Sequence, residues 1–134
     1  MKPWFQIYNA GTTAIPLSDL TIRYWFTINV EKTMVFNCDY AFLGCANLTG
    51  TYTKLPTAKT NADYYLEVSF KASAGNLAAG GNSGEIQTRL NKSDYTNMTQ
   101  TDDYSFDGTK SSFALWDHVT VYNKGVLVYG VEPP

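Results

Sequence analysis

The stretch Leu20-Thr21-Ile22-Arg23-Tyr24-Trp25-Phe26-Thr27-Ile28 decides the fold class, because every second residue in it is apolar or aromatic. The even-numbered residues form one face of an extended strand, and the odd-numbered residues form the other. Such a period of two over nine residues is typical of a half-buried β-strand rather than a helix.

The same alternation recurs on both sides of this stretch. It runs through residues 4–8, 64–70 and 85–90, and residues 119–129 predict a hairpin whose turn contains Gly125. The connecting segments are rich in Gly, Ser, Asn and Thr, and no window combines a helical period with helix caps. Short strands with frequent turns and no helices predict an all-β, antiparallel β-sandwich.

The composition limits the class of protein. The chain has 134 residues, of which 44% are apolar and 16% charged, so we expect one folded domain. Ten Lys and Arg stand against 12 Asp and Glu, and no basic patch of the kind that binds nucleic acid is present. No apolar run approaches the length of a membrane span. We expect a module over residues 1–130, with residues 131–134 starting a linker.

Cys38 and Cys45 are separated by six residues, a spacing that fits neither a CxxC redox site nor a zinc site. Two readings remain: a pair of buried free thiols, or a disulfide that closes a small loop. We expect the disulfide, which indicates an oxidising, extracellular setting.

The chain offers little catalytic chemistry. The single histidine, His118, has no nucleophile placed beside it in the sequence, and Gly81-Asn82-Ser83-Gly84 lacks the spacing and the following helix of a nucleophile elbow. The adjacent Asp102 and Asp103 repel each other unless solvent or a cation offsets their charge. The sequence alone leaves open whether they form a solvated acidic turn or ligate a hard cation such as calcium.

One set of residues suits sugar recognition. Gln87 and Arg89 share a strand face, Asp94 and Tyr95 follow within a turn, and Asp39-Tyr40 lie inside the cysteine loop. Exposed aromatic rings can stack on the apolar faces of pyranose rings, while polar groups bond to the hydroxyls at their edges. The same composition also suits a protein-interaction patch.

Several stretches, in order over nearly the whole chain, resemble family 3 carbohydrate-binding modules, the cellulose-binding domains of cellulases and scaffoldins. These stretches are residues 9–15, 20–24, 38–40, 62–70, 84–89, 92–95, 102–108, 116–117 and 127–130. The resemblance implies a jelly-roll-like sandwich of eight or nine strands that has no catalytic activity. It also implies that the family's first strand lies before Met1, which would leave one sheet edge open.

The resemblance further implies a planar strip that binds crystalline cellulose, with Asp39 and Arg89 held as a flat ion pair. The full strip maps to Asp39, Tyr40, Gln87, Arg89, Tyr95 and Ser111. Two departures reduce its stacking area: Tyr95 stands where the family has Trp, and a further strip Tyr has no counterpart.

The resemblance also implies a structural calcium ion. Its ligands map to Thr27, Asn29, Thr99, Asp102 and Asp103. Asn29 stands where the family has Asp, so the site loses one charge, although an amide carbonyl can still ligate calcium.

The sequence therefore predicts a secreted module that binds cellulose or a related cell-wall polysaccharide and keeps a covalently linked enzyme, scaffold or sensor near it. Two alternatives remain: a module that feeds single chains to a neighbouring catalytic domain, and a protein-interaction domain that has lost sugar binding. If the strip does not bind cellulose, we expect a second exposed aromatic set on the other sheet, at Arg23, Trp25 and Tyr65, to be the next candidate.

Overall fold

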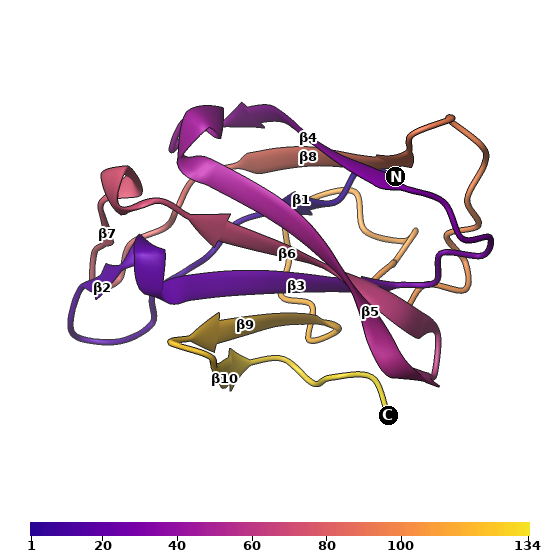
Figure 1. Cartoon of the computed structure of the whole chain (residues 1–134). Helices are drawn as coiled ribbons and strands as arrows, with labels where there is room; N and C mark the ends of the chain where they lie inside the picture. The colour runs from indigo at the N-terminus through magenta and orange to yellow at the C-terminus, as the bar shows by residue number, and fades with distance from the viewer.

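The computed structural model describes all residues from Met1 to Pro134, and its regular secondary structure consists almost entirely of antiparallel strands (Figure 1). The strands are β1 (Trp4–Phe5), β2 (Ile15–Pro16), β3 (Leu20–Phe26), β4 (Met34–Ala41), β5 (Leu48–Lys59), β6 (Ala62–Phe70), β7 (Asn76–Leu77), β8 (Ile86–Lys92), β9 (Val119–Asn123) and β10 (Val126–Tyr129). Three single turns of 3-10 helix join them: η1 (Leu17–Asp19), η2 (Cys45–Asn47) and η3 (Ala72–Ala74). There are ten β segments instead of eight or nine, because three have only two residues.

Two sheets form the layers of the sandwich. One has the order β1-β8-β4, and the other has the order β10-β9-β3-β6-β5; β2 and β7 form a small extra pair. All strand pairings are antiparallel, as the alternation predicted. No helix is long and apolar enough to cross a bilayer.

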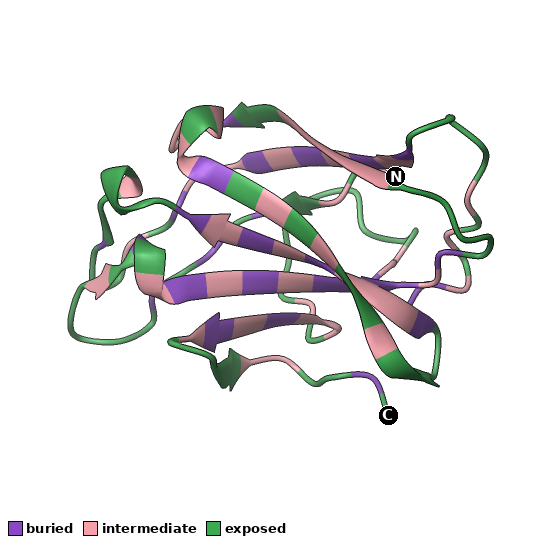
Figure 2. Cartoon of the chain, in the orientation of Figure 1, coloured by how far each residue is buried: buried purple, intermediate pink, exposed green.

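The alternating residues of the two sheets meet in one core, which appears as stripes of buried and partly exposed residues along β3 and β8 (Figure 2). Phe26, Leu66 and Val68 of the five-stranded sheet face Ile86 and Leu90 of the three-stranded sheet, and all five are fully buried. Since each large apolar side chain stabilises the fold by about 1.5–3 kcal/mol when buried, this cluster holds the layers together.

The hairpin of β9 and β10 closes as predicted, with Lys124 at φ 49° and Gly125 at φ 80° in its turn. Two consecutive residues with positive φ match the right-handed twist of the flanking strands.

Residues 131–134, where the sequence predicts the start of a linker, make several contacts with the rest of the domain. The Val131 amide donates to the carbonyl of Asp117 at 2.7 Å, Pro133 is fully buried, and the Thr60 amide donates to the carbonyl of Pro134 at 2.9 Å. In this structure, residues 131–134 therefore pack as part of the domain.

At the opposite side of the sandwich, β1 is the edge of the three-stranded sheet, and β8 is its only partner strand.

Candidate functional site

The outer face of the β1-β8-β4 sheet carries most of the residues assigned to the sugar-binding strip. Along β8, Ile86, Thr88 and Leu90 are buried, so Gln87 and Arg89 point to the opposite, solvent-facing side. The period of two in the sequence thus fixes which β8 side chains form this face.

A β-bulge in β4 places two consecutive residues on that face. Cys38 pairs with Thr88 and Tyr40 pairs with Gln87, so Asp39 is an extra residue without a partner of its own. A bulge of this kind re-aims the side chains beside it. Both Asp39 and Tyr40 are consequently exposed, whereas regular alternation would turn one of them inward.

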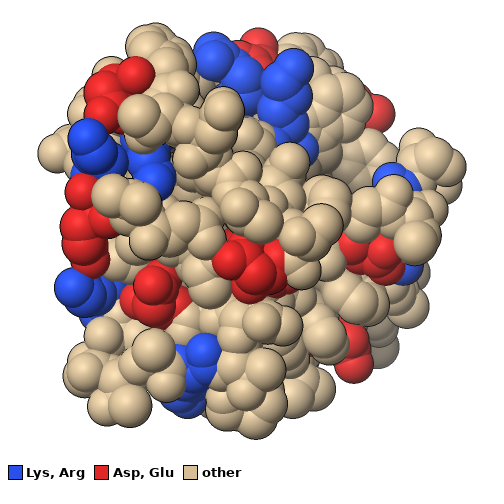
Figure 3. Space-filling view, turned by 90° about the vertical axis from the view of Figure 1, so that its right-hand side faces the viewer, with Lys and Arg blue, Asp and Glu red and all other residues tan.

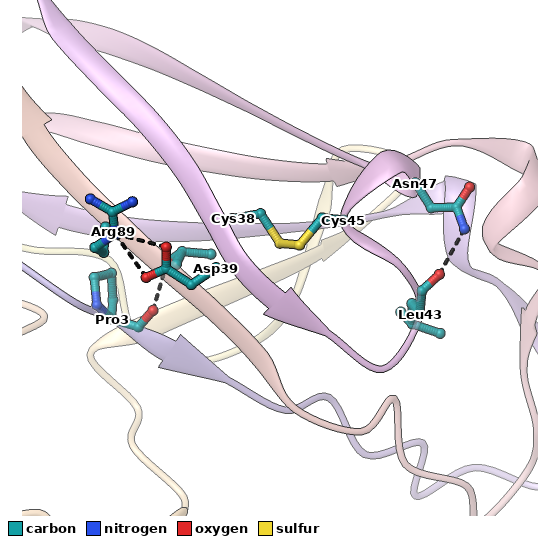
Figure 4. Close-up of a disulfide and its surroundings, with 8 residues drawn as sticks. Pro3, Cys38, Asp39, Leu43, Cys45, Asn47 and Arg89 are labelled. Carbon is teal, nitrogen blue, oxygen red and sulfur yellow. Dashed lines mark hydrogen bonds and ion pairs between the residues drawn. A yellow bond between two sulfur atoms is a disulfide. The ribbon is translucent and has the colours of Figure 1, made fainter.

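The disulfide predicted between Cys38 and Cys45 is present, with the two Cα atoms 5.7 Å apart (Figure 4). It links the strand at the bulge to the start of η2. Within the same loop the Asn47 amide donates to the carbonyl of Leu43 at 2.7 Å. Together these links restrain the loop that carries Asp39 and Tyr40.

Arg89 and Asp39 form the predicted ion pair: Nε of Arg89 donates to both carboxylate oxygens of Asp39 at 2.8 Å (Figure 4). Both side chains are more than a third exposed, so solvent screens the pair and it contributes at most about 1 kcal/mol to stability. What the pair provides is a planar polar group that lies on the face with little net charge.

Tyr95 and Ser111 lie outside the sheet, in the connection that follows β8. Tyr95 lies three residues beyond β8, has φ 58° and is 78% exposed. The neighbouring Asp94 forms an ion pair with Lys32 and accepts hydrogen bonds from the amide and the hydroxyl of Thr96. These contacts lower the pKa of Asp94. Ser111 belongs to the long connection between β8 and β9.

Beside β1 lies a groove of about 720 Å³ that sequence reasoning did not foresee. Trp4, Glu85 and Ser111 border it, and the core residues Phe5 and Tyr24 contribute to its lining. Trp4 pairs directly with Gln87 and is 50% exposed. The alternation of residues 4–8 signalled that Trp4 faces outward, but only the register shows that it lies beside the strip.

The five residues assigned to calcium also come together, through hydrogen bonds between residues 27–29 and residues 99–103. On the face of the molecule that lies to the right in Figure 1, acidic and basic side chains are interspersed (Figure 3). Asp103 accepts from the amide and the hydroxyl of Thr27 at 2.8 and 3.1 Å. The Asn29 amide donates to Asp102 at 2.8 Å, and its oxygen accepts from the Thr99 amide at 3.0 Å.

Two oxygens of this cluster have no partner within the protein. Oδ1 of Asp102 and Oδ2 of Asp103 are buried and accept no hydrogen bond. Burial, assisted by the charges of Asp102 and Asp63, raises the pKa of Asp103 to about 7. A hard cation would satisfy both oxygens, and the rest of the set consists of amide and threonine oxygens, so the residues fit calcium. No cluster of three or more His, Cys, Asp or Glu is present, so such a site would depend on these neutral oxygens.

The expected second aromatic surface is wrong in its central residue. Trp25 is only 3% exposed, because residues 104–105 return over this part of β3. Its indole donates to the hydroxyl of Thr120 at 2.9 Å, and its amide donates to Ser105 Oγ at 2.7 Å. Arg23 lies 4.3 Å from the ring centroid of Tyr65 and is paired with Glu67, so these side chains pack on one another.

The chain resembles known proteins over its full length. Residues 1–130 match the family model described as "Cellulose binding domain". The chain is 49% identical to a xyloglucanase of Paenibacillus sp. over 99% of its own length and 13% of that protein. A biomass sensing module of an RsgI-like protein of Clostridium thermocellum superposes with a TM-score of 0.96 at 36% identity, covering 99% of this chain and 87% of that one. Module CBM3b of the scaffoldin ScaA of Acetivibrio cellulolyticus gives a TM-score of 0.93 at 43% identity, covering 98% and 86%.

The curated relatives are much longer than this chain. It spans 13% of the xyloglucanase and 14% of an exoglucanase of Thermoclostridium stercorarium, to which it is 49% identical.

Proposed function

Because the chain belongs to the cellulose-binding-domain family, the family 3 carbohydrate-binding modules, we propose that it binds the flat face of crystalline cellulose. The family consists of non-catalytic carbohydrate-binding modules, and this chain is one of them.

The observation that carries the proposal is the Asp39–Arg89 pair on the outer face of the three-stranded sheet. The bulge sets Tyr40 beside this pair, and Tyr95 lies beyond the end of β8. A ring on either side of a planar, nearly neutral group suits a flat ligand that offers apolar ring faces and equatorial hydroxyls. Gln87 and Ser111 supply hydrogen-bonding groups beside this row.

Sedimentation with microcrystalline cellulose tests the proposal. The parent should sediment with the solid, and Tyr40→Ala combined with Tyr95→Ala should abolish this. High salt should change binding little, because screening acts on exposed charges and not on ring stacking. If the double variant sediments as the parent does, the row is not the binding site. Preferential binding to soluble cello-oligosaccharides would instead favour a module that handles single chains.

We also propose that the module acts as part of a larger, extracellular protein. The disulfide and the relatives named as a xyloglucanase and as scaffoldin and biomass sensing modules support this role. Tethering raises the effective concentration of a linked domain at an insoluble substrate without any new contact.

Finally, we propose that Thr27, Asn29, Thr99, Asp102 and Asp103 hold a structural calcium ion. The two unpartnered carboxylate oxygens support this, because burying charged oxygens without a partner is costly. A ligand that binds only the folded state stabilises it by mass action, so calcium should raise the melting temperature and a chelator should lower it. An unchanged melting temperature would contradict the proposal.

A further inference from the structure

We infer that Trp4 is a further aromatic contact residue, which stacks on a second glucan chain beside the one that follows the Tyr95–Tyr40 row. This inference rests on the proposed function, since it adds a residue and a second line of contact to the same surface.

Trp4 lies on the outer face of the three-stranded sheet. Trp4 pairs with Gln87, and Gln87 pairs with Tyr40, so three residues on three neighbouring strands lie in one line across the sheet. In an antiparallel sheet, directly paired residues point to the same face. The next line confirms the direction, since Phe5, Ile86 and Ala41 are paired and all three are buried.

The ring of Trp4 has no role in holding the fold together. It belongs to neither hydrophobic cluster and makes no aromatic or cation–π pair. The indole of Trp25 donates to Thr120 and that of Trp116 donates to the carbonyl of Ser105, whereas the indole of Trp4 has no hydrogen-bond partner. A half-exposed tryptophan that the fold does not use is the kind of residue that serves as a binding anchor.

The position of Trp4 separates it from the first row. Asp39, Tyr40 and Arg89 lie on β4 and β8, and Tyr95 follows the end of β8, so their row runs roughly along the strands. Trp4 lies on the other side of β8, two strand spacings or about 9.6 Å from Tyr40. A single extended glucan chain that follows the row does not cover Trp4, whereas a sheet of parallel chains does.

Polar groups suited to sugar hydroxyls flank Trp4. Glu85 and Ser111 border the same groove, and the Gln87 amide donates to Glu85 at 2.9 Å. Stacking on Trp4 with hydrogen bonds to these groups would form a second contact line, and it would favour a flat, insoluble surface over a soluble chain.

Binding of Trp4 variants to two ligands tests the inference. Trp4→Ala should lower affinity for microcrystalline cellulose about tenfold, the upper end for one aromatic contact. The same change should leave affinity for soluble cellohexaose unaltered. Trp4→Tyr should retain most of the affinity for the solid. Val128→Ala, which removes an exposed apolar side chain from β10, is the matched control and should bind as the parent does.

The outcomes separate this inference from the proposed function. If Trp4→Ala binds cellulose as the parent does while the Tyr40/Tyr95 double variant does not, the inference is wrong and the proposed function stands. If the double variant also binds normally, the Tyr95–Tyr40 row is not the binding site, whereas a parent that does not sediment with cellulose would overturn the proposed function. If Trp4→Ala loses the same affinity for microcrystalline cellulose and for cellohexaose, Trp4 contacts the first chain and the second contact line is overturned.

Fluorescence quenching gives a measurement that needs no destabilising variant. The fluorescence of the parent minus that of Trp4→Tyr reports Trp4 alone. We expect acrylamide to quench this difference signal strongly in solution and weakly when the protein is bound to cellulose. Equal quenching in both conditions would overturn the inference.

Discussion

The stability of the metal-free protein should fall as the pH rises from 4 to 7, because Asp103 must ionise while buried. Asp103 is 4% exposed, and burial raises the pKa of its carboxyl from 3.8 to about 7. Between these values the folded protein keeps a proton that the unfolded chain has lost. The free energy of unfolding therefore decreases with rising pH.

The size of the effect follows from the pKa change. At about 1.4 kcal/mol for each pKa unit, the loss is on the order of 4 kcal/mol, complete above pH 7. The full contribution is present below pH 4. Bound calcium would offset the charge, so the dependence should largely vanish when calcium is in excess.

Urea unfolding at pH 5 and pH 8, each with EGTA or with calcium, measures this. Asp103→Asn is the informative variant, because its amide oxygen can still accept from the Thr27 amide while carrying no charge. With EGTA at pH 8 we expect this variant to be more stable than the parent, and calcium should no longer stabilise it. A parent whose stability in EGTA is the same at both pH values would refute the reasoning.

Three further predictions concern the site and its support. Cys45→Ser should lower the free energy of unfolding by roughly 2–3 kcal/mol and weaken cellulose binding, as denaturant unfolding and sedimentation would show; unchanged stability would contradict it. Arg89→Ala should weaken cellulose binding but change stability by less than about 1 kcal/mol, since its pair with Asp39 is exposed; intact binding would remove the pair from the site. Ser105→Ala should cost about 1–3 kcal/mol by leaving the buried Trp25 amide without its acceptor, and thermal unfolding that matches the parent would show that water replaces it.

The sequence predicted the strands well, because a period of two depends only on which residues avoid water. Residues 20–26 and 86–90 form strands whose inward residues are those the alternation indicated. The sequence did not predict the bulge at Asp39, because a residue is an extra one only relative to the pairing of its strand with the neighbouring strand. The resemblance assigned Asp39 and Tyr40 to one surface, and the bulge explains how two adjacent residues share it.

Alternation also says nothing about what covers a face once it has been assigned. Trp25 occupies an outward position of β3, but residues 104–105 lie over it, and the Tyr104 hydroxyl donates to the carbonyl of Val131. The same long-range contacts draw residues 131–134 onto the domain. Contacts between segments about 80 or 30 residues apart leave no mark on a local pattern, so the sequence did not predict them.

Trp4 and Trp25 show why register, more than residue type, decides where a binding surface lies. Both alternate with buried neighbours in a strand, and the sequence alone gives no reason to treat them differently. Trp25 pairs with Tyr65 in the five-stranded sheet, where residues 104–105 cover it and Thr120 accepts a hydrogen bond from its indole. Trp4 pairs with Gln87 in the three-stranded sheet, in line with Tyr40, and half of its surface stays exposed. A buried tryptophan with a bonded indole stabilises the fold, whereas an exposed one with a free indole has its stacking face available to a ligand, and cellulose binding by Trp4→Ala measures which description applies.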